Sequence, residues 1–431
     1  MFTTMEISSR TSKFHMVLLK IFIFLIVFDS ARNYTYLPAE IGYIKDAIVF
    51  LFGGLLLINY SKIKMPSIGI AFYGLMIFTL FYSWIGIVNS NGLAIRNIVV
   101  YILKNIEFFI LVIVFKNSKL FNLDLKDLIN FYLKLSLVLV FVNIIGYFVP
   151  NPIVYRGITK HFDNGYYENR ITVGQPAISI FPLLLSYFYT AIFVDRHKIL
   201  KMIIYTTGII ISVSTTGVLS FVLCNLILLL FINNLNKDAR RQILKFYLLM
   251  FLFAFVVLIL IVDTDVFKQA SELIGSKIKA FFFDDGVDPS MKIRDLKFES
   301  ALKKAQTLFD KLFGLGAYGY YDVEFNSDFE NIENTYRSVL LFYGYVGASF
   351  FILFLARNII ISFKDAVCSR SKAAIMILVL FIIYAMHAYT LDIFYTSTIL
   401  SSFGLFFNLP EKQTLIKKEK GLPKTLCVQN A

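Results

Sequence analysis

The sequence has little charge for its length. Of its 431 residues, 16% are charged and 58% are hydrophobic. Soluble globular domains carry about 25% charged residues, so this chain has too few of them to cover a surface in water. The scarcity of charge therefore excludes an ordinary soluble protein and indicates one that lies largely in a membrane.

Cysteine is scarce as well, and the three cysteines, Cys224, Cys368 and Cys427, lie far apart in the chain. This spacing provides neither a disulfide framework nor a metal-binding motif. The first apolar run is not followed by a small-residue cleavage site. We therefore expect a retained helix there and no cleavable signal peptide.

Long apolar runs are what the sequence has in abundance. At roughly 17–25 residues each, they are long enough to cross a hydrocarbon core of about 30 Å. We predict twelve membrane spans, at about residues 15–30, 43–60, 66–88, 97–115, 128–149, 176–194, 199–213, 217–233, 243–262, 338–356, 373–389 and 393–408.

The net charge of +13 could indicate a nucleic-acid-binding protein, but the positions of the charges argue against it. The basic residues gather in the short loops after alternate spans, where the positive-inside rule places them. We therefore expect no nucleic-acid partner, and we place both termini in the cytoplasm.

The predicted fold is an all-α polytopic membrane protein in four parts. Residues 1–262 hold the first nine spans and include a shorter outer loop at residues 150–175. Residues 263–337 form a long, partly helical loop on the same outer side. Residues 338–408 hold the last three spans, and residues 409–431 form a basic cytoplasmic tail. Because both polar loops face outward, we expect the functional site on that side.

The long outer loop contains a predicted amphipathic helix. It starts at Asp288-Pro289, with Asp as the N-cap and Pro in the first turn, and it ends before Gly314. Arg294 falls on one face with apolar residues at helical spacing, namely Phe298, Ala301, Leu302, Ala305, Leu308, Phe309 and Leu312. A guanidinium on a buried face requires an anion. That anion is either a carboxylate of the loop or a phosphate of a ligand.

Further cations lie in the shorter outer loop and in the fourth span. Arg170 lies close to the start of span six, and the neighbouring cations form either an anion site or a solvated face. In span four, Arg96 and Lys104 fall near one helix face, and Glu107 can neutralise Lys104 at a spacing of three. Lys104 therefore belongs either to a structural ion pair or to a site for a lipid phosphate.

The end of the long loop places Glu333 and Arg337 four residues apart, where span ten begins. The pair is either a salt bridge at a helix start, where an acid suits the positive end of the dipole, or part of a catalytic site. In the second interpretation, Glu333 is the general base that removes a proton from a sugar hydroxyl.

Taken in order, these motifs resemble the O-antigen polymerase and O-antigen ligase superfamily of bacterial envelope polysaccharide synthesis, the Wzy-type proteins. The segment "RITVGQP" is similar to the Arg-x-x-Gly element of the family, with one extra residue between Arg170 and Gly174. The family order of Arg, aromatic, Ala-Leu, Gly-x-Gly, His-Asn, Gly-x-x-Gly is similar to Arg294, Phe298, Ala301-Leu302, Gly314-Leu315-Gly316, Glu333-Asn334 and Gly344 to Gly347. The turn "SVSTTG" resembles the Ser-rich turn of the family. Ligases commonly carry His where this chain has Glu333, which favours a polymerase.

The resemblance implies a GT-C-like glycosyltransferase in the bacterial inner membrane that needs neither a metal nor another cofactor. It would transfer a growing glycan from undecaprenyl diphosphate to a lipid-linked repeat unit at the outer face. Its partners would be that lipid-linked oligosaccharide, membrane lipid, and a chain-length regulator and flippase of the same pathway. The implied catalytic residues are Glu333 as the base, with Arg170 and Arg294 to neutralise the leaving diphosphate. The implied binding residues are Arg170, Arg294, Arg337, Asn334, Arg96 and Lys104.

Two alternatives stay open. Within the family, an O-antigen ligase would join the polymer to the lipid A core. In another class, a lipid-linked oligosaccharide flippase would also have about twelve spans. Many transporters contain internal repeats and helices broken near the midplane. The sequence has no convincing repeat, and its polar residues gather in one outer loop, which favours the enzyme.

Overall fold

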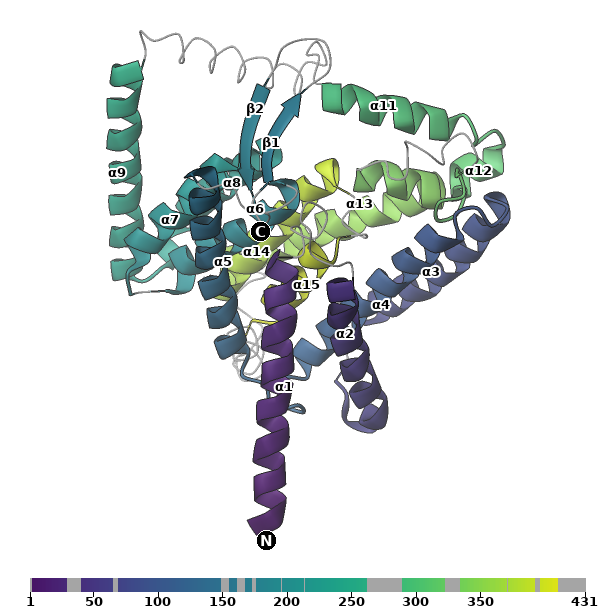
Figure 1. Ribbon diagram of the computed structural model, residues 1–431, viewed down its shortest axis with the longest axis horizontal. Helices are drawn as coiled ribbons and strands as arrows, with labels where there is room; N and C mark the ends of the chain where they lie inside the picture. Colours follow the sequence, from purple (N-terminus) through teal and green to yellow (C-terminus); the bar gives the residue numbers. More distant parts are fainter. Residues whose placement is uncertain are drawn as a thin grey trace.

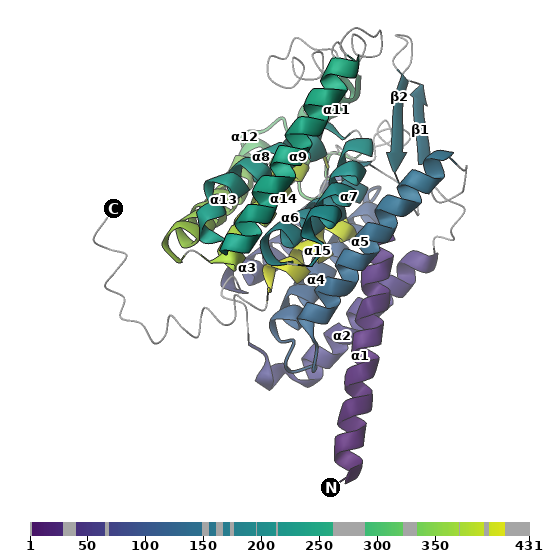
Figure 2. The ribbon, with the colours of Figure 1, turned by 90° about the vertical axis from the view of Figure 1, so that its left-hand side faces the viewer.

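The computed structural model describes twelve stretches of the chain, and the statements below concern these alone: residues 2–28, 40–64, 69–148, 155–160, 167–172, 176–194, 196–212, 214–261, 289–321, 334–369, 371–391 and 396–409. Within them the protein is a bundle of helices with one β-hairpin at one end (Figure 1). The hairpin and the N-terminus lie at opposite ends of the bundle in both perpendicular views (Figure 2).

The helices follow the apolar runs of the sequence closely, and each predicted span overlaps one helix. The helices are α1 (Phe2–Phe28), α2 (Glu40–Ile58), α3 (Gly69–Asn89), α4 (Ile95–Lys116), α5 (Leu125–Phe148), α6 (Pro176–Phe193), α7 (Lys198–Ile211), α8 (Thr215–Leu230), α9 (Lys237–Ile261), α11 (Pro289–Leu302), α12 (Leu308–Phe313), α13 (Thr335–Ser369), α14 (Lys372–Thr390) and α15 (Ser397–Phe407).

Four of the described helices are long and apolar enough to cross a membrane. They are α4, the part of α5 from residue 125 to 145, α13 and α14, and shorter apolar helices lie within α6, α8 and α15. These helices indicate a membrane-embedded protein. That the helices matching the twelve predicted spans all cross the membrane stays a prediction.

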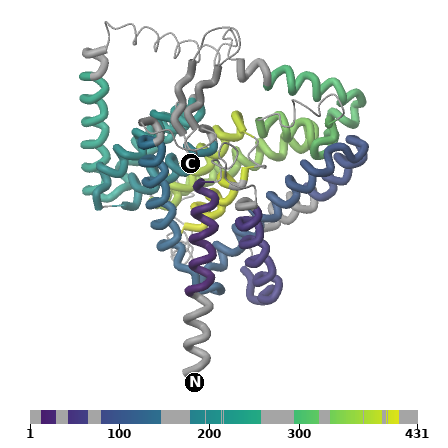
Figure 3. The backbone as a smooth tube through the Cα atoms, in the orientation of Figure 1, coloured from purple at the N-terminus to yellow at the C-terminus, as the bar shows by residue number. Residues whose placement is uncertain are grey.

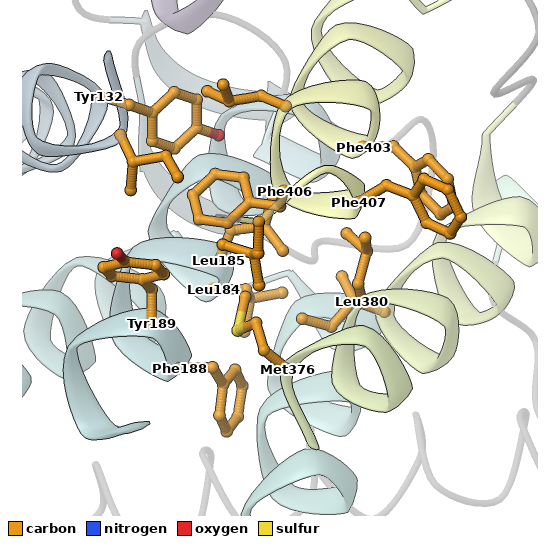
Figure 4. Close-up of a cluster of buried hydrophobic side chains, with 14 of the residues drawn as sticks. Tyr132, Leu184, Leu185, Phe188, Tyr189, Met376, Leu380, Phe403, Phe406 and Phe407 are labelled. Carbon is orange, nitrogen blue, oxygen red and sulfur yellow. The ribbon is translucent and has the colours of Figure 1, made fainter. Parts of the chain in front are cut away.

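Helix α6 forms the centre of the main core. Every residue from 179 to 192 is buried, including the polar Ser186 and Thr190. A helix that is buried on all sides must be surrounded by other helices. In Figure 4, Leu184 and Phe188 of α6 lie among side chains of α5, α14 and α15. Strand β2 (Tyr167–Thr172), which precedes this central helix in the chain, contacts α5, α6 and α7.

The shorter outer loop departs from the all-α prediction. It contains strands β1 (Tyr155–Lys160) and β2 (Tyr167–Thr172), which pair as an antiparallel hairpin. Tyr, Ile and Thr recur in both strands, and these residue types fit a pleated strand well. The segments are too short to stand out beside runs of about twenty apolar residues.

The helix predicted from Asp288 to Gly314 is wrong as one element, because the structure has two helices there. Helix α11 ends at Leu302, and α12 begins after Thr307. The Thr307 hydroxyl accepts from Asp310 N at 3.1 Å, and the Asp310 carboxylate accepts from Thr307 N at 3.0 Å. This reciprocal capping starts a new helix in a new direction. Consequently the predicted apolar stripe holds only in part: Ala301 and Ala305 are buried, whereas Leu302, Leu308, Phe309 and Leu312 are exposed.

A second, smaller core is built by the chain that follows α12. Residues 314–321 return between α3 and α13, and Leu315 N and Gly316 N donate to Leu341 O and Phe342 O at 2.8 and 3.0 Å. These carbonyls lie just before Gly344, where α13 is broken by a backbone with φ of 64°. The break leaves carbonyls without helical donors, and the returning segment supplies them.

Candidate functional site

Two of the predicted site residues fall wholly or partly outside the described residues. Glu333 lies just before the described segment that begins at residue 334. The backbone of Arg170 lies in β2, opposite Gly157 of β1, and its side chain is outside the description. The hairpin therefore places the Arg170 backbone at the end of the bundle opposite the N-terminus (Figures 1 and 2).

Arg337 joins the loop helix α11 to the start of α13. Its Nη2 forms an ion pair with Oδ1 of Asp295, and its guanidinium carbon lies 5.1 Å from the centre of the Phe298 ring. A guanidinium over an aromatic face is attracted by the negative charge of that face. The side chain is about one-quarter exposed, so both contacts lie at the edge of water. Arg337 thus links α13 to α11 through a contact with Asp295, which lies 42 positions earlier in the chain.

Arg294 lies in the same part of the structure. It precedes Phe298 by one helical turn on α11, so both side chains emerge from one side of that helix. Arg294 is half-buried, and it takes part in at least one interaction. Arg294 therefore lies one helical turn from the Phe298 ring that Arg337 contacts.

The start of α13 is held rigidly. The buried Asn334 caps the helix, because its Oδ1 accepts from Arg337 N at 3.1 Å. Thr335 donates from both its backbone N, at 3.1 Å, and its hydroxyl, at 2.6 Å, to the Leu391 carbonyl at the end of α14. The hydroxyl of Tyr336 donates to Ala385 O at 2.9 Å. Arg337 therefore projects from a fixed point on the bundle.

Lys104 lies in a charge network that joins α4 to α2. Its Nζ lies 2.9 Å from Asp46 Oδ1 and 3.1 Å from Glu107 Oε1, which confirms the pairing expected from the spacing of three. Lys45, which is 1% exposed, contributes a fourth charge 3.8 Å from Asp46. Two cations and two anions balance, so within these four residues the charges are mutually compensated.

Arg96 does not share the environment of Lys104, contrary to the shared face that the sequence predicts. Arg96 is exposed at the first turn of α4, whereas Lys104 is only 11% exposed at its side chain. Eight residues amount to a little more than two turns, and the remaining rotation of roughly 80° separates the two side chains. The structure therefore does not bring these two residues together.

His387 is a buried polar residue on α14, near the start of α13. Its Nδ1 lies 2.8 Å from the Ile383 carbonyl, which can only accept, so Nδ1 is the donor and a neutral ring leaves Nε2 as an acceptor. Nε2 has no hydrogen-bond partner among the described residues. One turn further along α14, Leu391 holds Thr335 of α13. The ring packs edge-on against Phe181 of α6.

The sequence predicts most of the charged residues near α13 but misses two other residues: Asp295, which pairs with Arg337, and Gly86, which lies against Ala317. Asp295 was detectable as an acid directly after Arg294 in a basic helix. Gly86 of α3 gave no signal, because its importance comes from a contact with Ala317, which is more than 200 residues away in the chain. Among the described residues, no group of three His, Cys, Asp or Glu side chains is arranged to hold a metal.

Comparisons with known proteins provide no assignment for the chain. No protein-family model matches the sequence, and no curated protein matches it. Its function must therefore be inferred from its own residues and from the resemblance of its motifs.

Proposed function

We propose that this protein is a membrane-embedded glycosyltransferase that polymerises lipid-linked repeat units of a bacterial surface polysaccharide. One observation carries the proposal beyond the motif resemblance. Arg337, at the start of α13, contacts Asp295 and Phe298 of the loop helix that bears Arg294, and Arg294 lies next to Asp295 and one turn from Phe298. An enzyme that releases a diphosphate without a metal needs such a concentration of fixed positive charge.

The proposed reaction balances as a displacement at the anomeric carbon. A hydroxyl oxygen of the lipid-linked acceptor forms a bond to the anomeric carbon of the donor glycan. The bond from that carbon to the diphosphate oxygen breaks, and undecaprenyl diphosphate leaves. The hydroxyl proton goes to Glu333, which directly precedes the cap of α13 in the chain.

The arginines have complementary roles in this proposal. Arg337 has five N–H donors, more than one carboxylate can engage, so the ion pair between its Nη2 and Asp295 can orient the side chain while other donors serve the ligand. Arg294 provides a second guanidinium on the same side of α11, and Arg170 provides a third from the hairpin. Asp295 is a positioning residue, because it acts through Arg337.

The same proposal gives the location of the protein, its orientation in the membrane and its substrates. The protein would lie in the bacterial inner membrane with about twelve spans and both termini in the cytoplasm, and the site would face outward. Its substrates would be undecaprenyl-diphosphate-linked oligosaccharides, and a chain-length regulator and a flippase would act beside it.

The broken helix α13 bears on the alternative of a flippase. Transporters often use broken helices to expose backbone groups to a substrate or ion. Here the carbonyls of Leu341 and Phe342 accept hydrogen bonds from the chain after α12. The break thus serves to dock the outer loop, and this favours the enzyme.

A deletion strain tests the proposal. Its surface polysaccharide is separated on a gel and compared after complementation with wild type, Arg294→Ala, and Arg241→Ala as an exposed arginine at the start of α9. We expect core plus a single repeat unit in the deletion and with Arg294→Ala, and a full ladder with wild type and Arg241→Ala. Bare core with polymer retained on the lipid carrier would instead identify a ligase. Repeat units trapped inside the cell would identify a flippase, and an unchanged ladder would refute all three.

A further inference from the structure

The short helix α12 has an apolar face that the protein leaves uncovered. At 100° per residue, Leu308, Phe309, Leu312 and Phe313 fill an arc of roughly 140°, while Asp310 and Lys311 lie on the remaining side. Leu308 is 74% exposed and Phe309 is 64% exposed. An uncovered apolar face on a helix of the polar loop requires a partner.

Helix α12 is held in place as a rigid element. The reciprocal hydrogen bonds of Thr307 and Asp310 fix its first turn, and Gly314 ends it with a φ of 81°. Phe309 and Phe313 pack on one another with ring centres 4.9 Å apart. The exposed face is thus part of an ordered helix and not a frayed end.

The chain after α12 fixes its position relative to α3. Ala317 N donates to Tyr82 O at 2.9 Å, and Asn89 Nδ2 donates to Leu315 O at 2.8 Å. These bonds attach the segment to the last two turns of α3, and α12 itself packs against α13, at the edge of the molecule where α3 ends in Figure 1. Figure 3 traces the chain from α11 through α12 at this edge of the molecule.

The same end of α3 has an exposed apolar surface of its own. Phe81, Trp84 and Val88 are 58%, 66% and 56% exposed. Trp84 is the only tryptophan of the chain, and tryptophan is enriched where a membrane meets water. The segment that follows α12 is therefore attached to a helix whose exposed residues suit the lipid interface.

The charges around α12 agree with the same partner. Lys303 and Lys311 are exposed, and Lys304 is half-buried nearby. Lysine can lay its apolar stem along a membrane surface while its ammonium reaches lipid phosphates. On α12 itself the side opposite the apolar face holds Asp310 and Lys311, and Lys303 and Lys304 lie just before the helix. An apolar face with basic residues close by is typical of a helix that lies in a membrane interface.

We propose that α12 is an interfacial anchor: its apolar face inserts among the phospholipids beside the end of α3, and the neighbouring lysines bind their phosphate groups. The anchor holds the outer-loop helices at the level of the lipid headgroups. This inference does not depend on the proposed reaction, because it rests only on α12, on α3 and on the membrane.

Tryptophan fluorescence in lipid nanodiscs tests the anchor on the full chain. Wild type, whose sole tryptophan is Trp84, is the reference. In a Trp84→Phe background, Phe309→Trp places the probe on the apolar face, and Lys311→Trp places it on the opposite face as a matched control. Each protein is studied with phospholipids brominated at a shallow or at a deep acyl position. Elution as a single species, as for wild type, verifies that each variant is folded.

We expect shallow bromines to quench the Phe309→Trp variant about as strongly as wild type, and more strongly than deep bromines do. The Lys311→Trp variant should be quenched clearly less. Equal, weak quenching of both variants, with strong quenching of wild type, would overturn the proposal. Shielding of the Phe309→Trp probe that appears only when two copies occupy one nanodisc would also overturn it, because a second protein would then be the partner.

Discussion

The docking of residues 314–321 against α3 depends on glycine, and this allows a quantitative test. Gly316 has a φ of 80°, and a Cβ at this position would overlap the backbone of Gly86 and Tyr82. The substitution Gly316→Ala therefore imposes two costs. A left-handed backbone costs a residue with a side chain roughly 1–2 kcal/mol. The overlap also forces the segment away from α3.

The second cost follows from the hydrogen bonds that hold this segment. Three backbone bonds, from Leu315, Gly316 and Ala317, are stretched or lost when it moves, at roughly 0.5–1.5 kcal/mol each. The total loss is about 3–6 kcal/mol. At about 2 °C per kcal/mol for a large domain, the Tm should fall by roughly 6–12 °C.

The chain offers graded controls for this experiment. Gly92 also has a φ of 80°, but nothing lies within 4 Å of a Cβ there, so Gly92→Ala should lower the Tm by only roughly 2–4 °C. Gly54 is helical and equally open, so Gly54→Ala should leave the Tm unchanged or slightly raised. The measurement is the temperature at which purified protein in detergent loses its monodisperse elution. A loss for Gly316→Ala no larger than that for Gly92→Ala would refute the backbone docking.

Two further predictions concern charged residues. Asp295→Asn should shorten the polysaccharide ladder without lowering the protein level, because Arg337 loses its orienting partner; a ladder of normal length would argue against the positioning role. Lys104→Met should lower stability by about 3–5 kcal/mol, because Glu107 is left as an uncompensated buried charge. The double variant Lys104→Met, Glu107→Gln should recover most of that loss in a thermal unfolding assay. A lack of recovery would show that Lys104 and Glu107 do not act as a compensated pair.

The helices could be predicted from the sequence because their signal is local. An apolar run of about twenty residues, such as that of α4, is read without knowledge of any neighbour. The pairing of Lys104 with Glu107 was equally visible, since a spacing of three places them on adjacent turns. Asp46 was not visible as the second partner, because it lies 58 residues away on another helix.

The features that were missed depend on contacts between distant segments or on short local signals. Gly314 was expected to end a helix, and it does so as the C-cap of α12. Its closeness to Gly344 of α13 is a tertiary contact that spacing cannot disclose. The break before α12 was in principle legible, because Thr307 and Asp310 have the spacing of a capping box. A continuous helical stripe concealed it, since apolar residues recur on both sides of the break.

Reconstitution tests the central claim most directly. Purified protein in liposomes would be incubated with undecaprenyl-diphosphate-linked repeat units extracted from the deletion strain, and both glycan length and released undecaprenyl diphosphate would be measured. We predict polymers of many repeat units, one undecaprenyl diphosphate released per linkage, and loss of both products with Arg294→Ala. Repeat units that stay single in the presence of folded wild-type protein would contradict the account.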